Sequence, residues 1–268
     1  MNAAHIPFRG AALLGAAALS LLAVPAAAQN SGGGTTVMAG IGAQAYPKYV
    51  GSDEYGIFPY FIGSFRRAGS PLNFSAPGDG LGVTILPRDS VFNFGPSVEF
   101  VNERQEDDVG APVGNVGFTV EAGGFVEIFP TENFRLRAEL RQGIGGHGGL
   151  VADLGADFVI RDRDTYVFSI GPRARWADND YHDAYFGITP GVAAASGLPV
   201  YDPGSGIYSY GAAAGLTYKL GRNWGMQGYL GYDRLVGDAA DSPIVRTLGS
   251  RDQFSGGAGL FFEFNIGG

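Results

Sequence analysis

The stretch of sequence that decides the fold lies near the middle of the 268-residue chain. It reads Phe134-Arg135-Leu136-Arg137-Ala138-Glu139-Leu140-Arg141. Apolar and charged side chains alternate over the whole stretch, and successive residues of a β-strand face opposite sides of a sheet. The pattern therefore predicts a strand with one apolar face and one face that carries three arginines and a glutamate.

The same period of two recurs along most of the chain. It is found in residues 92–100, 118–128, 152–160, 224–232 and 254–264. Each run is about ten residues long, which is the length of a tilted strand that crosses a membrane. A soluble β-sandwich would also alternate. Aromatic residues near the strand ends favour the membrane, because they are typical of the girdles at its interfaces: Trp176, Tyr208, Tyr210, Tyr218, Trp224 and Tyr232.

The N-terminus has the ordered features of a secretion signal. A basic region with Arg9 precedes the apolar run 11–24, and the small residues 26–28 precede Gln29. The run is too short for a transmembrane helix, which needs about 20 apolar residues. A buried core helix is the alternative, and the order of the three features disfavours it. We expect residues 1–28 to be a cleaved signal peptide and residues 29–268 to form one domain in the outer membrane of a Gram-negative bacterium.

Composition excludes several classes of protein. The chain has no cysteine, so it has no disulfide, no reactive thiolate and no acylated cysteine anchor. It carries 18 Lys+Arg and 26 Asp+Glu, a net charge of −8. An acidic balance argues against a nucleic-acid partner, whose electrostatic footprint would be basic. The 45 glycines, with 19 Phe and 13 Tyr, are typical of an all-β chain with many turns.

The connections between the predicted strands alternate in length. Residues 86–90, 130–133, 161–164 and 221–223 are short, whereas residues 102–115, 177–206 and 235–251 form long polar loops. Outer-membrane barrels have short periplasmic turns, long outer loops and an even number of strands. We count about eleven candidate strands and expect an antiparallel transmembrane β-barrel of 10–12, with twelve slightly preferred. The region between Tyr55 and Leu86 is where a strand is hardest to place.

Charged residues gather on the predicted inner face of three consecutive strands. They are Arg135, Arg137, Glu139, Arg141, Asp153, Asp157, Arg173 and Arg175. Opposite charges on adjacent strands are cross-strand neighbours. The favoured interpretation is a ladder of salt bridges inside the barrel, and the alternative is a charged constriction that selects solutes.

One glycine-rich stretch, Gly143–Gly148, formally matches the dinucleotide-binding pattern G-x-G-x-x-G. A dinucleotide site needs a helix to open after the glycines, but another period-two strand follows. We therefore predict a tight hairpin. His147, inside it, would need a nucleophile and an orienting acid to act as a base, and no spacing in the sequence supplies them.

The acidic loop with Asp178, Asp180, His182 and Asp183 lacks the residue spacing of a calcium loop. We expect solvated loop charge there rather than a metal site. The sequence thus gives no catalytic, cofactor or metal residues, and we do not expect an enzyme.

Several short stretches occur in a characteristic order along the chain. They are residues 49–55, 58–60, 140–142, 145–149 (with Gly146, His147 and Gly148), 152–157, 171–172, 176–181 (with Asp178 and Asp180), 185–187, 194–202 and 235–245 (with Asp238, Asp241, Ser242 and Pro243). Their combination covers most of the chain and resembles the MipA/OmpV family of outer-membrane proteins, named after an MltA-interacting protein.

The resemblance implies a scaffold that links outer-membrane lipids to a lytic transglycosylase and a penicillin-binding protein in the periplasm. A small-solute channel is the alternative, and an enzyme acting on lipid is a third class for which we find no catalytic set. Lumen size separates the first two, because about 8 strands enclose a lumen filled by side chains and 16–18 leave an aqueous channel. A filled lumen would favour the scaffold.

Overall fold

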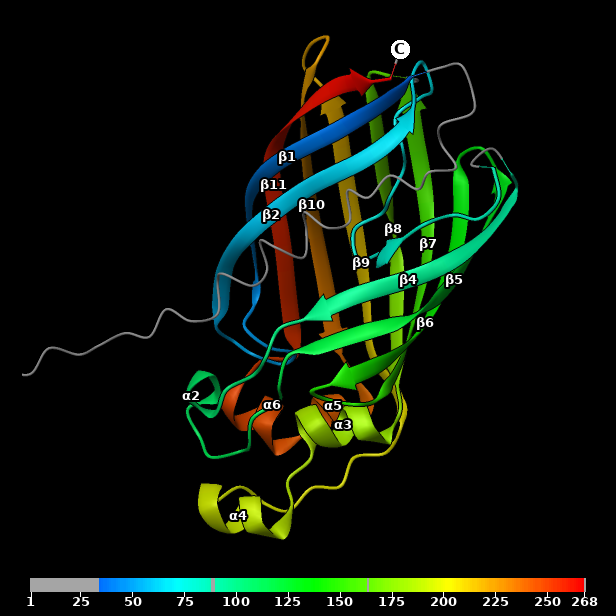
Figure 1. Cartoon of the computed structure of the whole chain (residues 1–268). Helices are drawn as coiled ribbons and strands as arrows, with labels where there is room; N and C mark the ends of the chain where they lie inside the picture. The colour runs from blue at the N-terminus through cyan, green and yellow to red at the C-terminus, as the bar shows by residue number, and fades with distance from the viewer. Residues whose placement is uncertain (1–33, 88–89, 163, 268) are drawn as a thin grey trace, which may run out of the picture.

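The computed structural model describes residues 34–87, 90–162 and 164–267. Eleven strands form one antiparallel sheet in the order β2-β1-β11-β10-β9-β8-β7-β6-β5-β4-β3, and the sheet curls around a lumen (Figure 1). The predicted antiparallel fold of 10–12 strands is confirmed. The predicted signal peptide lies outside the described residues. No helix in the described ranges has the length and hydropathy to span a membrane.

The strands are β1 (Thr35–Pro47), β2 (Tyr55–Arg67), β3 (Leu81–Gly82), β4 (Phe92–Val101), β5 (Thr119–Thr131), β6 (Phe134–Gly145), β7 (Leu150–Asp162), β8 (Tyr166–Ala177), β9 (Gly206–Lys219), β10 (Trp224–Leu235) and β11 (Asp252–Ile266). The helices are α2 (Glu106–Val109), α3 (Asn179–Phe186), α4 (Pro190–Ser196), α5 (Gly237–Asp241) and α6 (Pro243–Leu248).

The period of two fixes which side chains enter the lumen. On β6 the arginines and the glutamate are buried, while Leu136 and Leu140 are exposed on the outer surface. Leu154, Leu230 and Leu260 are also exposed on the outside, and this belt of apolar side chains suits a hydrocarbon environment. The lumen therefore holds the charges, and the outer face meets lipid.

The two ends of the sheet differ as the loop lengths predict. Short turns join the strands at the end where β1 begins and β11 ends, and helices α2 to α6 gather at the opposite end (Figure 1). By the rule for outer-membrane barrels, the first end faces the periplasm and the second faces outward. The helices were not predicted. Three of them have side-chain caps, because Asp178, Thr189 and Ser242 accept hydrogen bonds from the first turns of α3, α4 and α6.

The region between Tyr55 and Leu86 accounts for the odd strand count. After β2, residues 68–80 do not form a strand and instead turn into the lumen, where Asp79 meets Arg135. The chain then runs back along β4 as β3, which has only two residues, and Ile85 N–H donates to Phe94 O beyond it. Within the described residues, β2 and β3 are the two ends of the sheet order and are not hydrogen-bonded to each other.

One aromatic residue that was expected in the outer girdle, Tyr208, points into the lumen instead. Tyr210, Tyr218 and Trp224 are exposed on the outer face, but Tyr208 is buried. The reason is an irregularity in the β8–β9 pairing, where Arg175 pairs with Ser209 and Trp176 pairs with Ile207. The extra residue, Tyr208, turns into the lumen.

Two apolar clusters close the interior at different heights. The cluster at the outer end is formed by residues of α3, α5, α6 and the strand ends, including Tyr181, Phe186 and Val245. The cluster in the periplasmic half joins Leu72 of the inward segment to Val159 and Phe261. The period-two pattern shows which side chains face the lumen, but it does not show which of them pack together in these two clusters.

The assignment of side chains to the lumen or to the lipid face predicts that two substitutions on β10 lower the free energy of unfolding by different amounts. Leu230 is 71% exposed on the outer face, so Leu230→Arg near the midplane should lower the free energy of unfolding by about 2–4 kcal/mol. Gln227 lines the luminal cavity, and Gln227→Arg should cost much less. Urea titration of refolded protein in lipid vesicles measures both, and equal losses would contradict the register.

Candidate functional site: the charged lumen and its outer cap

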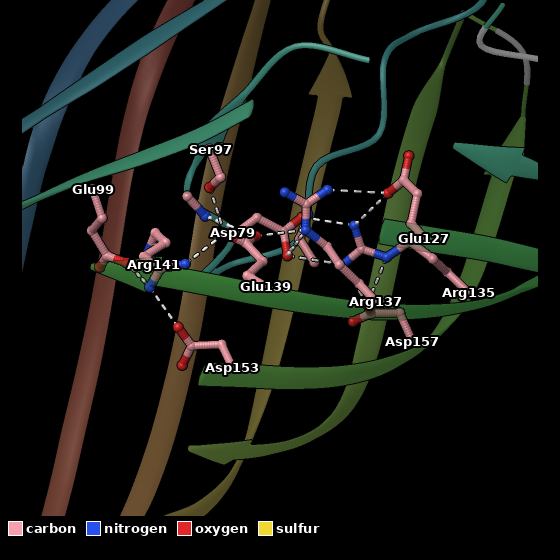
Figure 2. A network of polar contacts seen from close by, with 12 residues as sticks. Asp79, Ser97, Glu99, Glu127, Arg135, Arg137, Glu139, Arg141, Asp153 and Asp157 are labelled. Atoms are coloured by element: carbon pink, nitrogen blue, oxygen red, sulfur yellow. Dashed lines mark hydrogen bonds and ion pairs between the residues drawn. The ribbon is translucent and has the colours of Figure 1, made fainter. Parts of the chain in front are cut away.

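The Arg135 side chain is only 2% exposed and lies among the buried charges of the lumen. Its Nε and Nη2 donate to Asp157 on β7 at 3.0 and 2.7 Å, because the two residues lie directly opposite in the ladder. Its Nη1 and Nη2 also donate to Asp79 at 2.7 and 3.0 Å. Figure 2 shows this guanidinium between the two carboxylates. One arginine therefore joins the wall to the inward segment.

The network continues toward the outer end through Arg137 and Arg141. Arg137 donates to Glu139 at 2.6 Å and to Glu127 at 3.2 Å, and its guanidinium carbon lies 3.7 Å from the Phe125 ring centre. Arg141 donates to Glu139, and Figure 2 shows both side chains. Arg141 also bonds three further carboxylates. These are Glu99, Glu121 and Asp153.

Arg141 neutralises two carboxylates that face each other across β6 and β7. Glu139 and Asp153 are directly opposite each other on β6 and β7, and like charges in that position repel. Arg141 places one nitrogen on each carboxylate and so cancels the repulsion. The arrangement explains why three arginines and one glutamate share the inner face of β6.

Arg173 and Arg175 on β8 complete the wall in different ways. Arg173 Nη2 donates to Asp157 at 2.6 Å, so that carboxylate is shared with Arg135. Arg175 lies 3.6 Å from Asp153 and 3.7 Å from Asp233. Both contacts are longer than hydrogen bonds, so Arg175 keeps donors available to the lumen.

The inward segment, residues 68–80, is held by several contacts. Asp79 bonds Arg135, as above, and its Oδ2 accepts from Ala76 N–H at 2.9 Å. The Phe74 ring lies 4.7 Å from the Arg135 guanidinium carbon, and Leu72 is buried in the periplasmic cluster. The segment thus fills the middle of the lumen.

His147 lies in the predicted hairpin, where Gly145, Gly146 and Gly148 have positive φ angles. Those angles are easily adopted only by glycine and let the turn fold inward. Gly149 N–H donates to His147 Nδ1 at 3.0 Å, so the ring proton is on Nε2 and donates to Glu121 at 3.1 Å. His147 is therefore a buried anchor of the turn between β6 and β7.

The loop motifs that resemble the family build the cap over the outer end. Asp178 is the N-cap of α3 and accepts from Tyr181 N–H at 3.1 Å. Ser242, the N-cap of α6, donates to Phe186 O at 2.8 Å and so joins α6 to α3. Asp238 accepts from Gly204 N–H at 2.7 Å.

Three further motif residues have simpler roles in the cap. Pro243 occupies the first turn of α6, Asp241 pairs with Arg251 at 3.0 Å, and Asp180 lies in the first turn of α3, where its negative charge is favourable. The acidic loop is therefore part of a packed cap. In the described part of the chain, no group of three or more His, Asp or Glu residues is placed to hold a metal ion.

A cavity of about 570 Å³ lies between the cap and the inward segment. Its walls carry the cap residues Tyr181 and Tyr185, the charged groups Glu99, Asp153 and Arg175, and side chains of β1, β2, β9 and β10. The filled middle of the lumen and the cap thus leave one chamber between them in the described structure.

Four carboxylates of the network were not among the predicted site residues: Asp79, Glu99, Glu121 and Glu127. The last three occupy inward positions of period-two runs, so the alternation could have identified them. Asp79 follows no periodic pattern, and nothing in the sequence places it beside Arg135.

A curled antiparallel sheet with an apolar outer face, a charged lumen and unequal loops defines an outer-membrane β-barrel protein. The family model described as MltA-interacting protein MipA matches residues 39–264. The chain belongs to the MipA family, as its motifs indicated. No curated protein matches the sequence.

Three solved structures show some similarity to the chain. The outer membrane protein OprG from Pseudomonas aeruginosa is 10% identical, with a TM-score of 0.27 over 88% of this chain and 98% of that one. A FadL homologue from Pseudomonas aeruginosa is 11% identical, with a TM-score of 0.30 over 87% and 88%. The toluene transporter TodX from Pseudomonas putida is 13% identical, with a TM-score of 0.33 over 91% and 92%.

The charge network predicts that two isosteric substitutions on β7 lower the free energy of unfolding by different amounts. Asp157 is fully buried and shared by two arginines, so Asp157→Asn should lower the free energy of unfolding by about 3 kcal/mol, because it leaves buried charge uncompensated. Asp153 borders the cavity, and Asp153→Asn should cost about 1 kcal/mol. Urea titration tests the ranking, and a larger loss for Asp153→Asn would contradict it.

Proposed function

We propose that this protein is an outer-membrane scaffold that holds a lytic transglycosylase, together with a penicillin-binding protein, at the periplasmic face of the membrane. The observation that carries the proposal is the filled lumen, where Arg135 and Arg137 meet carboxylates of the wall and of the inward segment. A barrel whose lumen is filled in this way is better suited to bind partner proteins at its rim than to conduct solutes. The name of the family supports the choice of a lytic transglycosylase as partner.

A small-solute channel is the alternative function. It would need a continuous polar path through the lumen. The cavity under the cap has Phe74, Pro77 and Asp79 of the inward segment in its lining, and Leu72 packs with Val159 and Phe261 in the periplasmic half. These contacts favour a scaffold over an open channel.

The periplasmic rim offers an apolar contact for a partner. The turn between β9 and β10 begins with Leu220, whose side chain is 61% exposed. Its neighbour Arg222 is also exposed and adds charge. The buried cores of protein interfaces are more apolar than the rest of the surface, and arginine is enriched at interfaces. We place the partner's footprint on this turn and the adjacent short turns.

A binding measurement tests the proposal. The protein in lipid nanodiscs should bind a soluble lytic transglycosylase of the same organism in a saturable manner, measured by biolayer interferometry. Leu220→Ser should weaken binding about ten-fold, because it removes an exposed apolar contact, and a loss of about 1.4 kcal/mol is a ten-fold change in Kd.

A matched control lies at the opposite end of the barrel. Val200, in the outer loop between α4 and β9, is 57% exposed, and Val200→Ser should leave binding unchanged. Failure of the wild-type protein to bind the transglycosylase would contradict the scaffold proposal. Equal weakening by the two substitutions would show that the periplasmic turn is not the contact.

A further inference from the structure

The cavity under the outer cap contains buried polar atoms that the fold does not use. Tyr185 Oη, Ser209 Oγ and Asp233 Oδ1 have no hydrogen-bond partner among the described residues, and all three residues line the cavity. The Ser209 and Tyr185 side chains belong to residues only 1% and 2% exposed. A buried polar group without a partner costs about 1–3 kcal/mol, so their convergence on one chamber points to a ligand.

Strand register places these groups on one surface. Asp153, Arg175 and Ser209 lie in a row across β7, β8 and β9, because Asp153 pairs with Arg175 and Arg175 pairs with Ser209. Asp233 is 3.7 Å from Arg175, and Tyr185 joins the lining from α3 in the cap. The lining of the chamber therefore includes two hydroxyls, a carboxylate oxygen and a guanidinium.

We propose that this cavity is a binding site for a small neutral saccharide. The unused groups include donors and acceptors close together, and a sugar hydroxyl can donate and accept at once. The charges of the lining, such as Arg141 with Glu99 and Asp153, are largely paired with one another, which favours a neutral ligand. An apolar ligand would leave the polar atoms without partners.

The aromatic lining and the size of the cavity fit the same ligand class. Tyr46, Tyr60 and Tyr229 line the side opposite the charged wall, and their rings offer apolar faces with polar hydroxyl tips. Burial raises the pKa of Tyr185 to about 12 against the opposing effect of Arg104, so this hydroxyl keeps its proton. A cavity of about 570 Å³ is within the range of small-molecule sites, about 300–1,000 Å³.

The cavity lining extends to the outer rim of the barrel. The lining reaches Lys48, in the loop after β1, and Asn102, directly after β4. Asn102 Nδ2 donates to Tyr46 Oη at 3.0 Å, a contact between the two sides of the sheet where β2 and β4 are not paired. Under this proposal a water-soluble ligand enters the cavity at this rim.

The test is binding of defined sugars to the purified protein in a detergent without a sugar headgroup. Saturation-transfer NMR and calorimetry would use glucose, N-acetylglucosamine, maltose and chitobiose, with the apolar probe N-phenyl-1-naphthylamine for comparison. We expect at least one sugar to bind. Ser209→Ala and Tyr185→Phe should each weaken its binding about five-fold, as expected for one lost hydrogen bond.

Ser97→Ala is the matched control. Ser97 is also a buried luminal serine, but its hydroxyl donates to Glu139 at 2.6 Å and it is not in the cavity lining. This change should lower the thermal midpoint and leave sugar binding unchanged, whereas Ser209→Ala should not lower the midpoint, because its hydroxyl has no partner to lose. The proposal is overturned if no sugar of the panel binds, if only the apolar probe binds, or if Ser209→Ala and Ser97→Ala weaken binding equally.

Discussion

The structure depends on one constraint: the buried guanidinium of Arg135 must be paired with carboxylates. Arg135 faces the lumen because β6 alternates with a period of two, and a buried ionised group is strongly destabilising unless it is paired. Asp157 of β7 supplies one partner through the ladder, and Asp79 of the inward segment supplies another. The second pairing draws residues 68–80 into the lumen. The same contact therefore explains the filled centre of the barrel and the short β3.

The lumen is blocked at two levels along the barrel axis, and these two levels limit the functions that the interior can serve. The inward segment and the arginines occupy the middle, and α3, α5 and α6 cover the outer end. The polar residues of the family motif around Asp238 and Ser242 serve the second closure. Ser242 caps α6 and joins it to α3, and Asp238 holds the loop residue Gly204. The polar residues of this motif thus make structural contacts within the outer cap. A barrel closed in this way supports a role in presenting surfaces and holding a small ligand.

The parts of the fold that follow from local periodicity could be predicted from the sequence. The inner and outer faces of β6 and β7 are an example, because each residue's side is set by the pleat. Residues 68–80 could not be predicted, since their path is set by a contact between Asp79 and a residue 56 positions away. Tyr208 was assigned to the outer girdle because an irregular pairing cannot be seen in a single strand. The cap helices escaped prediction because they are short and stabilised mainly by their N-caps and packing.

The central claim is that the lumen is filled at the level of Arg135. Single-channel recording of the purified protein in a planar lipid bilayer tests it most directly. The filled lumen predicts that insertion of the protein produces no steady conductance above that of the bare bilayer, at either polarity of the voltage. Reproducible, ohmic conductance steps that scale with salt concentration would contradict the claim and would identify the protein as an open channel.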